Sequence, residues 1–323
     1  MDISDRIPLS IEAKRRLERS ESNHKRLVTI YAGVTALVLA LASAVTWWLS
    51  SRIGDTGGLQ GIGMRSMLET AATVLQIGSS IALPFWTMGY VFCMLGIARG
   101  NRMESRDLLG GFQRFFPLLR LKLYRVFKYF ILAILCAYPS SVVFMMTPLG
   151  KPVLEIMEPL MQNATDTAQV MAMMDEATAA AITEAMEPSM LVFIPMFLLL
   201  AAPLYYRLRM ADYILLDNPK MGVMQAVHLS TLLTLRKRMQ LFLLDLRFWW
   251  FYLGMGLSMA LCYAPLVLGW FGTILPLWAD YACYGGYLVL QFGMTVLARN
   301  KVEVTWAVAY ESLTEKLNGE TPC

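Results

Sequence analysis

Residues 248–279 read FWWFYLGMGLSMALCYAPLVLGWFGTILPLWA, 32 positions without a single Asp, Glu, Lys or Arg. Five further uncharged stretches reach at least 18 residues, at 27–51, 70–98, 129–150, 188–206 and 281–298. The hydrocarbon core of a bilayer is about 30 Å thick and takes about 20 helical residues to cross. The sequence therefore predicts an all-α, polytopic membrane protein with six transmembrane helices.

The composition of the 323 residues supports this class. Hydrophobic residues make up 57% and charged residues 16%, whereas ordinary soluble domains have about 45–50% and about 25%. This surplus of apolar side chains argues against a water-soluble protein, and disordered chains have the opposite balance.

The distribution of basic residues predicts the orientation in the membrane. Of the 28 Lys and Arg residues, 25 fall on one side of the predicted spans, and the other side has Arg52, Arg65 and Lys151. Basic residues stay in the cytoplasm because they resist translocation. We therefore expect a multi-pass protein of the cell membrane with both termini in the cytoplasm. The predicted spans lie at about 27–49, 74–98, 129–146, 190–206, 248–268 and 281–298.

The domain organisation follows from these spans. A basic cytoplasmic segment, 1–26, precedes the six-span domain, 27–299, and a cytoplasmic amphipathic helix with a tail occupies 300–323. Three spans share a pattern in which a tyrosine is followed 11 to 13 residues later by an asparagine and an apolar stretch. The pattern fits a repeat of two-span units with cytoplasmic amphipathic helices. It also fits membrane hairpins that leave the bilayer in a similar way without being repeats.

The loop 147–189 is the one long segment predicted outside the cell. It has seven acidic residues against Lys151, and an Ala-, Met- and Glu-rich stretch, 168–186, that favours a helix. Its methionines could be packing residues or soft ligands for Cu(I). Packing is the preferred interpretation because no His or Cys accompanies them, and no metal is assigned.

The sequence lacks the residue motifs of most known classes of catalytic site. The chain has two histidines, His24 and His228, no P-loop, no GxSxG motif and no CxxC pair among its five cysteines. We therefore expect no catalytic residue and no cofactor. The basic clusters lie beside predicted spans, which indicates contact with anionic lipid and not with nucleic acid.

The remaining candidates are polar residues near or within the spans. Asp245 interrupts an apolar run, and a charge there is expected to find a basic partner, Arg125 or Lys128, or to form an ion pair at headgroup depth. Two amides deep in spans, Gln76 and Gln291, are candidates for contacts across helices. The candidate contacts with lipid or a partner protein are Arg125, Lys128, Arg236, Lys237, Arg238, Asp245 and Arg247.

Several short motifs carry a family resemblance. They are Met88-Gly89-Tyr90 with Ala98-Arg99-Gly100, and Tyr206, Met210-Ala211, Asp217-Asn218-Pro219, Ala226, Ser230, Phe242 and Leu244-Asp245-Leu246. With these the chain resembles an uncharacterised six-span integral membrane protein family of Gram-positive bacteria, a domain of unknown function. It is also distantly similar to the membrane domain of glycerophosphodiester phosphodiesterases. The resemblance implies a bacterial membrane protein and supplies no catalytic residues.

Three functions remain after these exclusions. We favour a non-enzymatic membrane scaffold or accessory protein whose cytoplasmic face engages anionic lipid or an unidentified membrane protein partner. A small-solute permease is the second hypothesis, because prolines interrupt several spans. An intramembrane enzyme that acts on lipid, with Asp245 in its site, is the third.

Overall fold

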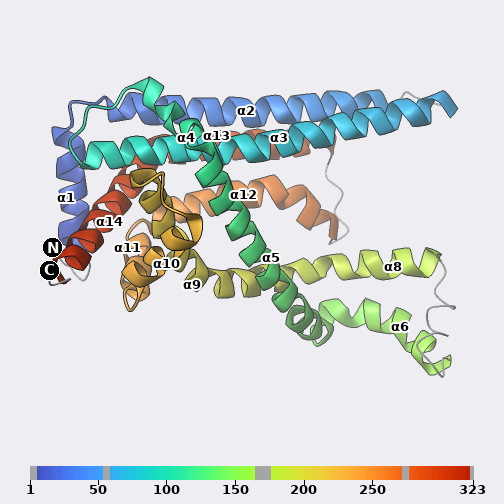
Figure 1. Cartoon of the computed structure of the whole chain (residues 1–323). Coiled ribbons are helices and arrows are strands. Elements are labelled where there is room, and N and C mark those ends of the chain that lie inside the picture. The colour runs from blue at the N-terminus through green and yellow to red at the C-terminus, as the bar shows by residue number, and fades with distance from the viewer. Residues whose placement is uncertain (1–5, 54–58, 164–175, 271–275, 321–323) are drawn as a thin grey trace. The chain divides into compact units, whose positions relative to one another are not determined.

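The computed structural model describes residues 6–53, 59–163, 176–270 and 276–320, and every regular element in these ranges is a helix (Figure 1). The all-α prediction is therefore confirmed. Contacts divide the chain into two compact units. The first unit takes 1–121, 206–265 and 275–323, and the second takes 122–205 and 266–274.

The first unit contains most of the helices. Three helices, α5 (Phe115–Met145), α9 (Met190–Asp217) and α12 (Trp249–Trp270), contribute residues to both units. The elements that lie within the first unit are α1 (Arg6–Arg19), α2 (His24–Ile53), α3 (Leu59–Ala98), η1 (Ser105–Leu109), α4 (Gly110–Gln113), α10 (Val223–Thr234), α11 (Arg238–Leu246), α13 (Leu277–Met294), the π-helical η4 (Thr295–Arg299) and α14 (Asn300–Glu320).

Helices α2 and α3 lie side by side and form the long axis of this unit (Figure 1). The ring of Tyr31 on α2 stacks on Tyr90 of α3, with ring centroids 4.4 Å apart. Gly89 of α3 lies directly against the backbone carbonyl of Leu108 in η1, so a β-carbon at this position would overlap that carbonyl. The absence of a side chain at Gly89 thus allows the segment after α3 to fold back onto the helix.

Helix α14 is the centre of the packing at the end of the unit where the terminal helices meet. Nine consecutive residues, Val302–Tyr310, are buried, and α14 contacts α1, α3 and α10. Leu9, Ala13 and Leu17 of α1, spaced four residues apart, are buried as well. The part of α14 from Val302 to Tyr310 is therefore enclosed by protein, and polar side chains such as Glu303 and Tyr310 bond within it.

The second unit contains η2 (Pro148–Gly150), α6 (Lys151–Asn163), α8 (Glu176–Met186), η3 (Glu187–Ser189) and parts of α5, α9 and α12. The rings of Tyr129 on α5 and Phe197 on α9 meet edge to face at 6.4 Å, and Phe144 is fully buried. Helix α8 covers the second part of the helix expected over 168–186. Residues 164–175, with Met171, Met173 and Met174, lie outside the described residues.

Five helical segments of the described residues are long and apolar enough to cross a membrane. They are His24–Val45, Thr70–Ala98, Phe115–Met145, Thr178–Asp217 and Trp249–Gly269. The chain is thus a multi-pass membrane protein by the length and composition of its helices. The sixth predicted span, 281–298, is helical in α13 and η4 but is not among the five, because tyrosines and Gln291 lower its hydropathy. The count of six and the repeat remain predictions.

Candidate functional site

Asp245 is held by three aromatic side chains in the first unit. Tyr206 donates a hydrogen bond from its hydroxyl to Oδ2 at 2.9 Å. Tyr252 (2.7 Å) and the indole N–H of Trp306 (2.8 Å) donate to Oδ1. These donors come from α9, α12 and α14, and the carboxylate lies on α11. One acidic residue therefore joins two consecutive helices, α11 and α12, to α9 and α14, which are more distant in the sequence.

The environment of Asp245 acts on its pKa in two directions. Burial raises the pKa above its ordinary value, whereas the three hydrogen bonds and the charge of Arg209 oppose the rise. Because three donors already occupy its two oxygens, the carboxylate serves to hold α9, α11, α12 and α14 together.

The basic partners predicted for Asp245 lie in the second unit. Lys128 has its ammonium over the ring of Tyr124, 5.6 Å from the centroid, and Arg125 is partly exposed on α5. A pairing with Asp245 stays a prediction. Arg247 is exposed directly after α11. What the sequence did not indicate is that hydroxyl and indole groups satisfy the carboxylate.

The basic cluster Arg236–Arg238 forms the tight turn between α10 and α11. Arg236 is exposed and has a φ of 61°, a left-handed conformation that is uncommon for a residue with a side chain. Lys237 and Arg238 are partly exposed. The turn thus presents a short basic surface, as expected for a lipid or partner contact, and that role stays a prediction.

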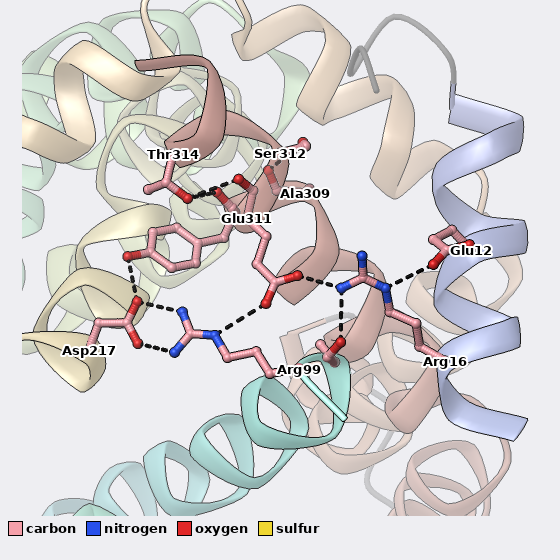
Figure 2. A network of polar contacts seen from close by, with 10 residues as sticks. Glu12, Arg16, Arg99, Asp217, Ala309, Glu311, Ser312 and Thr314 are labelled. Atoms are coloured by element: carbon pink, nitrogen blue, oxygen red, sulfur yellow. Dashed lines mark hydrogen bonds and ion pairs between the residues drawn. The ribbon is translucent and has the colours of Figure 1, made fainter. Parts of the chain in front are cut away.

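A second polar network, shown in Figure 2, connects α1 and the C-terminal ends of α3 and α9 to the middle of α14 in the first unit. Arg99, directly after α3, binds Asp217 of α9 through two hydrogen bonds, at 2.6 and 2.7 Å. Its Nε donates to Glu311 of α14 at 3.2 Å, and Tyr310 donates to Asp217 at 2.9 Å. The hydrogen bonds to Asp217 raise the pKa of Arg99 above its ordinary value. This arrangement is a two-pronged Arg–carboxylate pair, the strongest common geometry for such contacts.

Arg16 of α1 extends the same network. It donates to Glu311, to the backbone carbonyl of Ala98 at 2.8 Å, and to Glu12 at 3.0 Å (Figure 2). Arg16, Arg99, Asp217 and Glu311 were not predicted as site residues from the sequence. Arg99 and Asp217 were nevertheless both part of the family motifs, which is the signal that pointed to them.

A third set of charges surrounds Glu303 of α14. Arg209 of α9 donates to its Oε2 at 2.8 Å, and Tyr213 donates to the same oxygen at 3.3 Å. The Nε of Arg299 lies 3.9 Å from Oε1, and the Arg299 guanidinium lies 4.9 Å from the ring centroid of Tyr31. Two arginines therefore share one carboxylate, and the shorter contact belongs to Arg209.

A cavity of about 260 Å³ lies between α2, α3, α13 and η4. Gln291, predicted to make a polar contact within the membrane, lines this cavity, and its Oε1 is buried with no hydrogen-bond partner among the described residues. Gln76 is exposed on α3 and does not line it. The lining residues with polar groups are Tyr31, Thr35, Thr87, Tyr287, Gln291, Thr295 and Arg299.

The described residues contain no group of three or more His, Cys, Asp or Glu side chains that could hold a metal ion. Asp245 does not line the cavity. The described part of the first unit thus has polar contacts that join its helices, and a cavity with a partly polar lining between α2, α3, α13 and η4.

These features define a class: an all-helical, multi-pass membrane protein whose polar residues hold its helices together. Within that class the chain belongs to the family described as "Protein of unknown function (DUF975)", whose model matches residues 12–273. The expected membership of a domain-of-unknown-function family is therefore confirmed. No curated protein and no solved structure matches the chain. The likeness to glycerophosphodiester phosphodiesterases and the Gram-positive origin stay predictions.

Proposed function

We propose that this protein is a non-enzymatic membrane scaffold or accessory protein. Its terminal-helix end faces the cytoplasm and engages anionic lipid or a partner protein through the basic turn Arg236–Arg238. The observation that carries the proposal is the Arg99 network, which fixes the ends of α3 and α9 to α14 and, through Arg16, to α1. A rigid end of this kind is the platform that a docking surface needs.

The charges at this end support a division of roles. Arg16 and Arg99 are occupied by Glu12, Glu311 and Asp217, whereas Arg236 is exposed at the turn. Basic groups near an anionic leaflet contribute about 1 kcal/mol each. Such a turn therefore suits contact with anionic headgroups.

The same packing bears on the number of crossings. Helices α1 and α14 contact each other, which supports a shared side of the membrane for both. A chain whose two terminal helices share a side crosses an even number of times. We therefore assign α13 as the sixth crossing, in addition to the five long apolar segments.

The proposal is tested by neutralising the turn in the full-length protein. We expect Arg236→Gln, Lys237→Gln and Arg238→Gln together to lower the anionic lipid that is extracted with the protein in native polymer discs, measured by lipid mass spectrometry. The matched control neutralises three exposed cations elsewhere, Arg15, Arg19 and Lys25. An equal loss in both variants, or none in the first, would contradict the assignment of the turn.

Transport of a small solute is the second candidate function. The cavity that touches Gln291 favours it, because a permease needs a polar site between its helices. Uptake of candidate solutes into proteoliposomes, with and without Gln291→Leu, tests this function.

A further inference from the structure

Arg299 is the one cationic residue that lines the cavity, and no acidic residue lines it. The Nε of Arg299 is buried and has no hydrogen-bond partner among the described residues. Two tyrosine rings, Tyr31 at 4.9 Å and Tyr90 at 6.0 Å, face its guanidinium. The face of an aromatic ring attracts a cation, but the ring has no net charge and does not neutralise the positive charge of Arg299.

The charge of Arg299 is only partly balanced by protein. The nearest carboxylate oxygen, on Glu303, is 3.9 Å away, beyond hydrogen-bond distance. Glu303 gives its shorter contact, 2.8 Å, to Arg209. The Arg299 side chain is 20% exposed, and its buried Nε is an unused donor beside a cavity. Such a group is suited to an oxyanion, because Arg donors match phosphate and carboxylate geometry.

The walls of the cavity narrow the choice of oxyanion. Hydroxyls of Tyr31, Thr35, Thr87 and Thr295 and the amide of Gln291 line one part of it. The Tyr31 and Thr87 hydroxyls bond to each other, and Thr35 and Thr87 donate to backbone carbonyls. Arg299 Nε and Gln291 Oε1 are the buried polar side-chain atoms of this lining that have no hydrogen-bond partner among the described residues. The remaining lining is mostly aliphatic and aromatic carbon, from Leu39, Leu83, Leu288 and Phe292. A volume of about 260 Å³ lies below the usual range of about 300–1,000 Å³ for sites of drug-sized ligands. The site therefore fits one small polar group with an apolar extension.

The position of Arg299 at the end of an uncharged stretch indicates which kind of molecule supplies the oxyanion. Arg299 directly follows the uncharged stretch 281–298, at the position where a membrane helix reaches the headgroups. We propose that this cavity binds the phosphate group of a phospholipid, with Arg299 as its counter-ion and the start of an acyl chain against Leu39 and Phe292. The site is separate from the turn Arg236–Arg238 and goes beyond the proposed function.

The test uses the full-length protein, freed of lipid in a neutral detergent. Three probes are added: phosphatidylglycerol, diacylglycerol with the same chains, and inorganic phosphate. Binding is followed by native mass spectrometry and by the thermal unfolding midpoint. We expect phosphatidylglycerol to bind and to raise the midpoint, and the other two probes to do neither. Equal binding of diacylglycerol would overturn the role of phosphate. Equal stabilisation by inorganic phosphate would overturn the lipid assignment and favour the transport function.

Variants connect this binding to the cavity. Arg299→Gln should weaken phosphatidylglycerol binding about tenfold, because a charge-assisted contact becomes a neutral one, and Arg299→Lys should weaken it less. Arg15→Gln, which neutralises an exposed cation of α1, is the matched control and should bind as the wild type does. Unchanged binding in Arg299→Gln, or the same loss in the control, would overturn the site.

A second variant covers the case in which Arg299→Gln does not fold. Ala36→Leu enlarges one lining residue and leaves every polar group in place. It should reduce lipid binding while the protein stays monodisperse, and full binding would overturn the proposal. The triple variant at Arg236–Arg238 should still bind phosphatidylglycerol in the cavity. The experiments therefore distinguish a failure of the lipid contact proposed for the turn from a failure of the lipid site proposed for the cavity.

Discussion

Helices α3 and α5 have the same mean hydropathy, 1.7, in their membrane-length segments and yet differ in burial. In α3 61% of the most apolar window is buried inside the protein, and in α5 only 11%. The buried part of α3 has small residues such as Gly89 and Cys93, which let neighbouring backbones come close. In α5 large side chains such as Phe127, Phe130 and Leu135 are exposed. Hydropathy thus indicates that a helix can enter lipid, and it does not distinguish a helix that packs against protein from one that faces outward.

The polar contacts follow the same division. In the first unit, the residues that surround α3 and α14 include Asp245, Glu303 and the Arg99 network. A polar group enclosed by protein must be hydrogen-bonded, and each bond therefore fixes a neighbour. We expect substitutions in this packed region to cost far more than substitutions on the exposed face of α5.

Among the polar contacts, the largest effect is expected for Asp245→Ala. It removes the acceptor for Tyr206, Tyr252 and Trp306. Tyr206 and Trp306 are buried, and each buried donor left without a partner costs about 1–3 kcal/mol. We expect the free energy of unfolding, measured by SDS titration in mixed micelles, to fall by about 4 kcal/mol. Asp245→Asn keeps one acceptor oxygen and should lose clearly less. Equal losses for the two variants would show that the three donors do not depend on the carboxylate oxygens.

Gly89→Ala comes next. The added β-carbon meets the Leu108 carbonyl, and overpacking of this kind typically costs about 1–3 kcal/mol. We expect a loss near the upper end in the same titration, because a backbone carbonyl cannot rotate away. Gly78→Ala is the matched control on the same helix, since nothing lies within 4 Å of its added carbon. If the two substitutions cost the same, close packing does not distinguish this part of α3.

The ion pair of Arg99 with Asp217 should contribute less. Arg99 is 39% exposed, and exposed pairs typically contribute about 0.2–1 kcal/mol, with two-pronged geometry at the upper end. A double-mutant cycle with Arg99→Gln and Asp217→Asn should give a coupling energy of about 1 kcal/mol. The same cycle on Lys14 and Glu18, exposed at 70% and 64%, is the control and should give a smaller value. A coupling near zero for Arg99 would mean that the pair does not hold α3 to α9.

The sequence allowed prediction of the helices but not of their partners. Uncharged runs such as 70–98 show where a chain can enter lipid, because the cost of burying charge is local to the run. The contact of Tyr206 with Asp245 spans 39 positions and that of Arg99 with Asp217 spans 118. Nothing in a single sequence connects such pairs, since they depend on how the helices pack.

The family motifs came nearest to predicting the polar contacts. The motifs contained Tyr206, Asp245, Arg99 and Asp217. They did not indicate that Tyr206 bonds to Asp245 or that Arg99 bonds to Asp217. Arg299 and Glu303 were missed altogether. Their spacing of four residues beside a predicted span was the available signal, but the same spacing is common on solvated helices.

The smallest effect is expected on the exposed face of α5. Phe130 is 61% exposed. Lipid chains are as apolar as its ring, so the ring gains little from its place in the folded protein and its removal should cost little stability. We expect a change in unfolding free energy below about 0.5 kcal/mol. Phe144→Ala is the matched control on the same helix: its ring is fully buried, and its loss should cost about 3–5 kcal/mol. A large cost at Phe130 would mean that this face contacts protein in the membrane. If the face contacts lipid, acyl chains fill the space that the ring leaves.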